Sequence, residues 1–547
     1  MLTAVFFGGC DNVLEVEFPK NQYSDVQIFS SEAGTELAVN GMYARLQEYD
    51  YYGSRTRLLL WPHSGKYQSK QGANDDANKL DITNTNINLD RLWLGMWQTV
   101  NIANIIIANA EGSGLDNEST TLGQAYFIRG IVYFDLVRIF GEVPLSTKPT
   151  TGEDLHLAKS PREDIYNVVI GDLMKAATLL PDRGEYQIGR PLKYAANAYL
   201  GKVYVTRAGE NDADIQPTGF DPVTESEITT ISITDFWEEA KKELDYVIAN
   251  GGYALTSTYA DLWVPSNRNT SESIFELQYG ITGDERTNDI IRDVVLSNSY
   301  LVPDGANTFG RIRPNKEMFS DHIIQYSGND YSGQNFIPAG NNAALINLDP
   351  AVADPRIDET YMYNFYTRTD NGNNVNLFPR VAGTNNNGFA HLKKYKDPNY
   401  DGTNSNQNII LFRYADVLLL RAEVENEING PTNAYAFVNQ VLARARNTST
   451  GTTVQPADWN TSNVPDKDNF RERIMKEREY ELNGEGHEWF DMRRRGLGRF
   501  QEQIDHHNAA VIFYGSEGRD FIFQNIETEM LIPIPLSELT SNNLINN

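Results

Sequence analysis

Apolar residues recur every three or four positions through much of this chain, which predicts a protein built mainly from amphipathic helices. The stretch 121–140 is apolar on nearly every side. We therefore expect a buried helix there, ended by Gly141 and Pro144. The same periodicity predicts further helices at 31–48, 90–110, 413–428, 431–446 and 467–483.

Residues typical of helix starts mark two more helices. Ser160 comes before Pro161 and Glu163, the arrangement of an N-cap, a first-turn proline and a capping box. Asp235 stands three residues before Glu238 and predicts a second helix start, with that helix running to residue 249.

A helix predicted to begin near Pro191 carries a repeat-like motif. Its Leu200, Gly201 and Tyr204 match the first half of the tetratricopeptide consensus. In that arrangement the glycine lets a second helix approach closely, and the tyrosine fills the space beside it. Antiparallel helix pairs that recur about every 30 to 45 residues build a superhelix.

Residues 255–410 have a different composition, rich in Asn, Gly, Asp and Tyr, with short strand-like pieces such as 274–279. A loop-rich block of this length inside a compact body is seldom a linker, and loops on rigid scaffolds carry binding sites. The predicted fold class is therefore mainly α. It is a tetratricopeptide-like helical-repeat superhelix, 31–254 and 411–547, with a loop-rich second subdomain containing short strands at 255–410.

The formal net charge of -27 argues against a nucleic-acid or anionic-membrane partner, because both would be repelled. It favours neutral or cationic ligands. The chain has 29 Tyr, 24 Phe and 7 Trp, which is compatible with stacking on carbohydrate as well as with packing between helices.

The motifs of common catalytic centres are not found: there is no His-Glu-x-x-His, phosphate-binding glycine loop or Gly-x-Ser-x-Gly. We therefore expect a protein without enzymatic activity and without a cofactor. Asp397, Asn399 and Asp401 match the first half of a calcium loop, and they are the one candidate site for a structural metal ion, calcium.

The segment 474–493 is too regular to be a solvated run of charges. Glu477, Glu481, Glu485 and Glu488 are three or four residues apart and are predicted to share one helix face, and Arg478 lies among apolar neighbours. This pattern predicts a partly buried ion network, which is stable only if every charge has a partner. The glycines at 484 and 486 are expected to break the helix.

This segment resembles the C-terminal signature of the SusD/RagB family, surface lipoproteins of Bacteroidetes that capture glycans or peptides for an outer-membrane importer. Four more segments are similar to family motifs in the expected order: Arg129 with 133–138, 140–145, 413–423, and the Pro-Ile-Pro of 533–535 with Glu538. The resemblance implies a SusC-like TonB-dependent transporter as partner.

The N-terminus is interpreted in the same light. An apolar run ends in small residues before Cys10, the only cysteine, which fits a lipoprotein signal remnant at 1–10 and a lipidated Cys10. Residues 11–30 are expected to be a polar tether. No other stretch is long and apolar enough to span a membrane. The protein is therefore expected at the extracellular face of the outer membrane, held by a lipid anchor only.

Recognition of neutral sugars needs flat aromatic faces together with fixed hydrogen-bonding groups. In the family the ligand lies in a shallow cleft built from two regions of loops. The matching regions of this chain supply the candidate glycan-binding residues Trp61, Tyr67, Asn86, Asn88, Arg91, Trp93, Tyr279, Asp284, Arg286, Tyr300 and Phe309. If Trp61 contacts sugar from a loop, Trp61→Ala should lose binding and leave the melting temperature nearly unchanged.

The leading hypothesis is a non-catalytic lipoprotein that captures oligosaccharide or polysaccharide and passes it to the importer. One alternative keeps the architecture and changes the cargo to oligopeptides, as in the RagB branch, where a negative cleft would favour cationic peptides. A tetratricopeptide-type protein-protein scaffold is a further alternative, and a surface hydrolase is the last.

Overall fold

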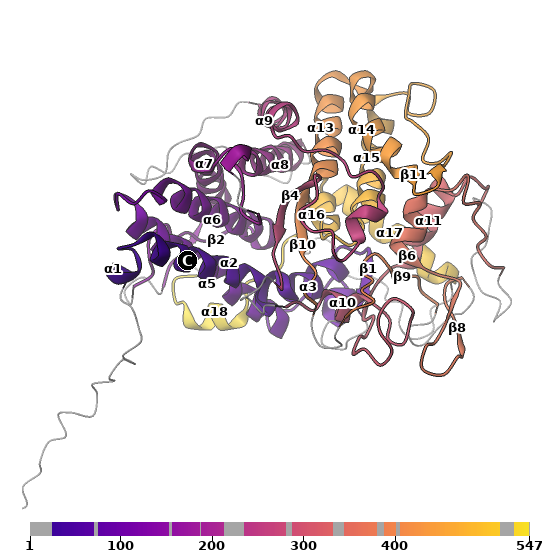
Figure 1. Ribbon diagram of the computed structural model, residues 1–547, viewed down its shortest axis with the longest axis horizontal. Helices are drawn as coiled ribbons and strands as arrows, with labels where there is room; N and C mark the ends of the chain where they lie inside the picture. The colour runs from indigo at the N-terminus through magenta and orange to yellow at the C-terminus, as the bar shows by residue number, and fades with distance from the viewer. Residues whose placement is uncertain are drawn as a thin grey trace, which may run out of the picture.

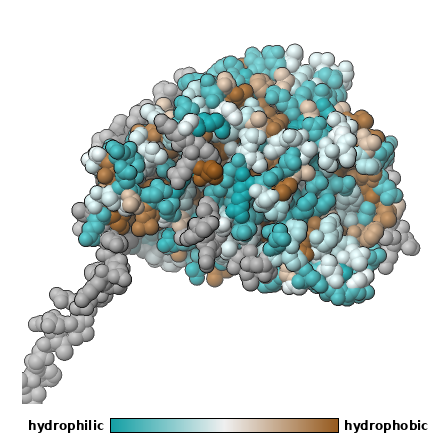
Figure 2. Space-filling model, in the orientation of Figure 1, coloured by the Kyte–Doolittle hydropathy of each residue, from teal (hydrophilic) through white to brown (hydrophobic). Residues whose placement is uncertain are grey.

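A computed structural model describes residues 25–69, 75–151, 156–185, 188–212, 235–280, 287–331, 344–379, 388–400, 405–514 and 530–545. The chain is mainly helical, with short strands confined to small sheets (Figure 1). The predicted fold class is confirmed. On the face shown in Figure 2, hydrophilic and neutral residues predominate and hydrophobic residues form small separate groups.

The N-terminal helices stack as antiparallel pairs, with α5 on α6, α6 on α7, α7 on α8 and α8 on α9. They are α1 (Asp25–Ile28), α2 (Glu32–Gln47), α3 (Arg55–His63), α4 (Asp75–Asn78), α5 (Ile87–Ala110), α6 (Glu118–Phe140), α7 (Arg162–Leu179), α8 (Lys193–Asp212) and α9 (Phe236–Asn250), with a π-helical turn η1 (Tyr49–Gly53) before α3 and a 3₁₀ turn η3 (Arg183–Glu185) before α8.

The C-terminal helices continue this stack across the long insertion, because α13 packs on α9 as well as on α14 and α15. They are α13 (Tyr414–Asn429), α14 (Pro431–Ala445), α15 (Lys467–Glu481), α16 (Glu488–Arg493), α17 (Leu497–Tyr514) and α18 (Leu536–Ser541). None of the helices in the described ranges is both long enough and apolar enough to cross a bilayer.

Close packing of α8 on α9 depends on Gly201. A Cβ atom at this position would lie 2.7 Å from Cδ2 of Leu244 on α9, which is too close for any real contact. Tyr204, one turn later, is buried beside it. The tetratricopeptide-like pairing predicted from these residues is therefore present in the structure.

One predicted helix start is correct and one is wrong. Asp235 caps α9, accepting hydrogen bonds from the backbone N–H groups of Trp237 and Glu238 at 3.0 and 3.2 Å. Ser160 does not cap α7. It belongs to strand β3 (Lys159–Ser160), which pairs with β2 (Val143–Pro144), and Pro161 takes the N-cap position. Strand pairing holds the Ser160 backbone extended one residue too early for capping.

The loop-rich region contains short elements: η4 (Ala260–Trp263), β4 (Ser273–Leu277), α10 (Ile290–Val294), β5 (Ile312–Pro314), α11 (Lys316–Tyr326), α12 (Pro355–Thr360), β6 (Tyr361–Met362), β7 (Phe365–Thr367), β8 (Asn374–Asn376), β9 (His391–Leu392) and β10 (Ile409–Arg413). Among the described residues every sheet has two antiparallel strands, and the pairs are β1 (Tyr67–Ser69) with β5, β4 with β10, β6 with β9, β7 with β8, and β11 (Asn447–Thr448) with β12 (Gly451–Thr452), besides β2 with β3.

Two large hydrophobic cores divide the molecule differently from the predicted boundaries. The first runs through the stacked helices and takes in Phe275 of β4 and Phe412 of β10. The second joins the loop-rich region to Leu58 and Trp61 of α3 and to Tyr67 of β1. Helix α3 was not predicted from the sequence, and it folds because Leu58 and Trp61 fill this second core.

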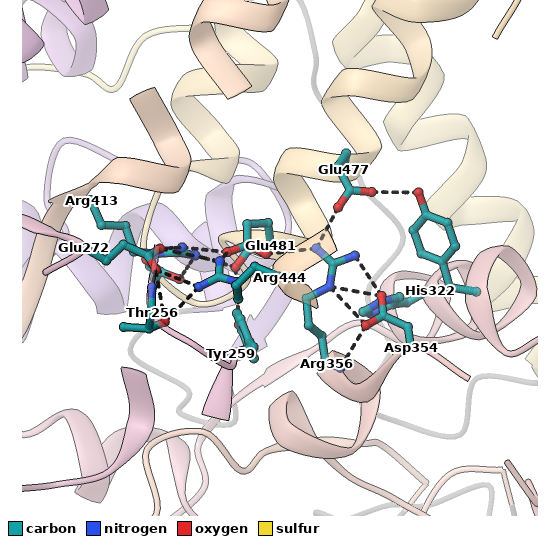
Figure 3. A network of polar contacts seen from close by, with 12 residues as sticks. Thr256, Tyr259, Glu272, His322, Asp354, Arg356, Arg413, Arg444, Glu477 and Glu481 are labelled. Carbon is teal, nitrogen blue, oxygen red and sulfur yellow. Dashed lines mark hydrogen bonds and ion pairs between the residues drawn. The ribbon is translucent and has the colours of Figure 1, made fainter. Parts of the chain in front are cut away.

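The predicted ion network is confirmed, and its centre is Glu481 at the end of α15 (Figure 3). Arg356 of α12 and Arg413 of β10 donate to this carboxylate at 2.9 and 2.6 Å, and Arg444 of α14 donates to it as well. Glu272 accepts from Arg413 and Arg444, each at 2.6 Å. The network therefore ties the helical stack to the loop-rich region from within.

The helix itself ends earlier than expected, at Glu481, so the four glutamates do not share one helical face. Gly484 and Gly486 have φ angles of 71° and 86°, and the turn that they form leads into α16. Glu485 still joins the network, accepting from Arg413 at 2.7 Å and from Lys394 at 3.0 Å.

Candidate functional site

Four of the aromatic residues proposed to contact ligand are in the interior, which corrects the sequence-based assignment. Trp61 is 6% exposed and Tyr67 is fully buried, and their rings lie 5.1 Å apart in the second core. The Tyr67 hydroxyl donates to Glu488 at 2.7 Å and accepts from the N–H of Gly484 at 2.6 Å. These two rings therefore support the signature segment and offer no face to a ligand.

Trp93 and Tyr279 are buried in the first core. The Trp93 ring packs edge-on against Phe140 with a centroid distance of 4.9 Å, and its indole N–H donates to Glu538 at 3.3 Å. The Tyr279 hydroxyl donates to the carbonyl of Gln47 at 3.0 Å. Packing in the first core explains both residues, so neither forms part of a binding surface.

Other candidate residues fall into three groups: some bond to other protein groups, one is exposed, and two lie outside the described residues. Asn86 caps α5, accepting from the N–H of Asn88 at 2.8 Å, and Asn88 accepts from Arg55 at 2.5 Å, so both side chains are committed to protein contacts. Tyr300 is exposed. Asp284 and Arg286 lie outside the described residues.

Phe309 is a proposed residue whose ring is partly exposed and is supported by arginines. It is 38% exposed, and its N–H donates to the carbonyl of Arg292 at 2.9 Å. The guanidinium carbons of Arg292 and Arg311 lie 4.9 and 5.6 Å from the ring centroid. Cation–π contacts of this kind fix the ring while leaving part of it open to solvent.

A buried carboxylate on α10 holds one of these arginines, Arg311, in place. Asp293 is fully buried and accepts from Nε of Arg311 at 2.6 Å and from Arg57 at 2.9 Å. Burial alone would lower the pKa of Arg311, but the charge of Asp293 raises it above its ordinary value. Arg292 faces Asp289 at 3.7 Å.

A second exposed ring, Tyr49 of η1, lies next to this group. The Arg55 guanidinium carbon is 4.4 Å from the Tyr49 ring centroid, and Tyr49 lies close enough to Arg311 to contribute to its raised pKa. The N–H of Asp289 donates to the carbonyl of Gly53 at 3.2 Å, which brings η1 and α10 together.

Arg91 of α5 completes the surface. Its side chain is 49% exposed and lies 4.0 Å from Asp50, which is also 3.5 Å from Arg55. We define the Tyr49–Phe309 surface as the six residues Tyr49, Arg55, Arg91, Arg292, Phe309 and Arg311. It combines two partly exposed rings with guanidinium donors held by buried or half-buried acids.

Sequence reasoning found Arg91 and Phe309 of this surface and missed the other four. Phe309, Arg311 and Arg313 occupy every second position, which is a strand-like signal that could have pointed to Arg311. Tyr49 lies in a Tyr-Asp-Tyr-Tyr-Gly run that directly follows the helix predicted at 31–48. Arg55 and Arg292 have no distinguishing local signal.

The calcium candidate is incomplete in the described residues. Asp397 accepts from the N–H of Asn399 at 2.9 Å, which is an ordinary Asx turn, and Asp401 lies outside the described residues. Within the described ranges, no group of three or more His, Cys, Asp or Glu side chains is placed to hold a metal ion. Cys10 and residues 11–24 of the expected tether also lie outside those ranges.

Two family models match the chain. Residues 271–547 match the model described as "SusD family", and residues 14–205 match the model described as "Starch-binding associating with outer membrane". SusD-like protein P25 of Formosa agariphila is 25% identical over 516 residues, which cover 89% of this chain and 87% of that protein.

Solved structures share the fold over nearly the whole chain. A SusD-like carbohydrate-binding protein from Bacteroides fragilis is 20% identical with a TM-score of 0.70, covering 95% of this chain and 99% of that one. A laminarin-binding SusD-like protein is 20% identical with a TM-score of 0.65, covering 94% and 98%. The "SusD family" model alone matches half of this chain, and this chain therefore belongs to the SusD family.

Proposed function

We propose that this protein captures glycan at the Tyr49–Phe309 surface and releases it without chemical change. The observation that carries the proposal is the pair of partly exposed rings backed by immobilised arginines, on a fold shared with a laminarin-binding protein. A pyranose ring presents C–H groups on its faces, which stack on aromatic rings, and hydroxyls at its edges, which accept from guanidinium N–H groups.

The rigidity of this surface favours binding. Before any ligand arrives, Asp293 holds Arg311, Asp50 lies 3.5 Å from Arg55, and Asp289 lies 3.7 Å from Arg292. Less side-chain freedom is therefore lost on binding. The three acids of this group, Asp50, Asp289 and Asp293, all face arginines. Such pairing suits a structural role better than the general acid–base pair that glycoside hydrolysis requires.

The cellular setting is proposed by analogy with the family. A lipid on Cys10 would hold the protein at the extracellular face of the outer membrane, and a SusC-like TonB-dependent transporter would receive the glycan. The family model described as associating with the outer membrane supports this placement. Co-purification of the full-length lipoprotein with a barrel encoded beside it tests the partnership; recovery of the lipoprotein alone contradicts it.

Binding is tested with a pair of matched phenylalanine variants. Phe309→Ala should abolish retardation of the protein in gels containing its polysaccharide and leave the melting temperature nearly unchanged. Phe365→Ala is the control, because Phe365 is 43% exposed on β7 and lies outside the Tyr49–Phe309 surface. Equal retardation of both variants would count against the proposed site.

The same protein tests the other functions. Incubation with a bound glycan followed by chromatography should show unchanged chain length, whereas shorter products indicate a hydrolase. Oligopeptides are the alternative cargo, but the arginines of the surface disfavour the cationic peptides expected for a negative cleft. Displacement of glycan by a peptide mixture would favour that alternative.

A further inference from the structure

We infer that the glycan held at the Tyr49–Phe309 surface is anionic, with carboxylate or sulfate groups along its chain; this inference rests on the proposed function. The surface is a local exception in a protein whose net charge is -27. Its ion-paired group contains more arginines than acids: Arg55, Arg57, Arg91, Arg292 and Arg311 against Asp50, Asp289 and Asp293.

The acids do not use all of the guanidinium donors. Within the described part of the chain, the buried Nε–H groups of Arg57 and Arg292 have no hydrogen-bond acceptor, and Nε of Arg55 has only its ion pair with Asp50 at 3.5 Å. Asp293 must serve both Arg57 and Arg311, and Asp50 must serve both Arg55 and Arg91. Each acid is thus shared, and positive charge remains at the surface.

The excess charge is located where a ligand would meet it. Arg91 is 49% exposed and pairs with Asp50, the residue after Tyr49, and Arg292 is 34% exposed and lies against the Phe309 ring. A guanidinium group pairs with carboxylate or sulfate oxygens through two parallel N–H donors. With a neutral sugar, Arg91 and Arg292 would keep only their long contacts to Asp50 and Asp289, at 4.0 and 3.7 Å, whereas an acidic sugar stacked on the rings would supply closer charged partners.

Matched polysaccharides test the ligand class. Polygalacturonate is compared with its carboxyl-reduced form, and carrageenan with its desulfated form, so that each pair differs only in the anionic group. The anionic member of at least one pair should bind about tenfold or more tightly than its neutral counterpart. Preference within the first pair assigns a carboxylate ligand and preference within the second assigns a sulfate ligand.

Arginine variants locate the effect. Arg91→Gln and Arg292→Gln should each weaken the anionic glycan about tenfold and leave any neutral glycan unaffected. Arg368→Gln is the matched control, since Arg368 is 33% exposed and paired with Asp370 on a different loop. Circular dichroism and melting temperature establish that each variant is folded.

The possible failures are distinct. If neutral glycans bind as well as anionic ones, and Phe309→Ala still abolishes binding, the inference about charge is overturned and the proposed function stands. If no polysaccharide of either kind binds, or if Phe309→Ala binds as well as the unmodified protein, both are overturned.

Discussion

Arg356 donates from Nη1 to Oε2 of Glu481 at 2.9 Å, joining α12 to the end of α15 across 125 positions of the chain. Both side chains are fully buried (Figure 3). Burial alone would raise the pKa of Glu481, but Arg444, Arg413 and Arg356 together hold it below its ordinary value. The carboxylate therefore stays ionised in the interior and acts as the joint between the two parts of the fold.

Glu481→Ala should destabilise the protein by about 3 to 5 kcal/mol, because it leaves buried arginines without a counter-charge. Urea denaturation followed by tryptophan fluorescence gives the free energy of unfolding. Glu472→Ala is the control, because Glu472 lies on the same helix and its side chain is 59% exposed. This change should alter the free energy of unfolding by less than about 0.5 kcal/mol. Similar losses in the two variants would refute the role of Glu481.

The helical scaffold and this network could be predicted from sequence because their signals are local. Helix periodicity, the Asp235 cap and the Gly201 motif each lie within one or two helical turns. The charge spacing around Arg478 predicted that the ion network is buried. The start of α7 was misplaced because the pairing of Ser160 with Val143 is a contact between distant segments. Propensity at Ser160 carries no information about that partner.

The binding surface was harder to predict for the same reason. Phe309 and Tyr49 are 260 positions apart in the sequence, and the two arginines that meet at Asp293 come from α3 (Arg57) and from the segment of Phe309 itself (Arg311). Trp61 was assigned to a loop although three leucines, Leu58 to Leu60, precede it, and its helix packs into a core supplied by the later loops. So short an apolar run does not reveal which distant segment will cover it.

Trp61→Ala should cost about 3 to 5 kcal/mol of stability, which reverses the expectation drawn from sequence. The indole packs against Tyr67 and lies 3.1 Å from where a Cβ on Gly486 would be, so truncation opens a cavity under the signature turn. Thermal melting checks the loss, and glycan affinity measured well below the melting temperature should be retained. An unchanged melting temperature together with lost binding would show instead that Trp61 contacts the glycan.

Glu488 provides a pH-dependent test of the interior. Burial raises the pKa of this carboxyl to about 6, although hydrogen bonds from Tyr67 and Gly484 oppose the rise. Since the folded pKa lies above the unfolded value, the folded state binds the proton more tightly. Its contribution to stability is complete below pH 4.5 and is lost as the pH rises through 6.

Glu488→Gln keeps an acceptor for Tyr67 and removes this titration. The free energy of unfolding of the variant, relative to the unmodified protein, should therefore rise by about 2 kcal/mol between pH 4 and 7.5. Parallel urea titrations of the two proteins measure the difference, in which the other titrating groups cancel. A difference that stays constant with pH would show that Glu488 ionises normally in the folded state.

Two mid-helix glycines should respond in opposite directions to the same change. Gly171→Ala on α7 meets nothing within 4 Å, so it should stabilise the protein by about 0.5 to 1 kcal/mol through helix propensity. Gly201→Ala gains the same propensity but forces its methyl group against Leu244, and overpacking costs about 1 to 3 kcal/mol. Its net effect should be destabilising, and Gly201→Val should be worse, because the α8–α9 pair can separate only by breaking its shared core. Differential scanning calorimetry of the three variants measures this order, and stabilisation by Gly201→Ala would mean that close approach of these helices is not required for the stack.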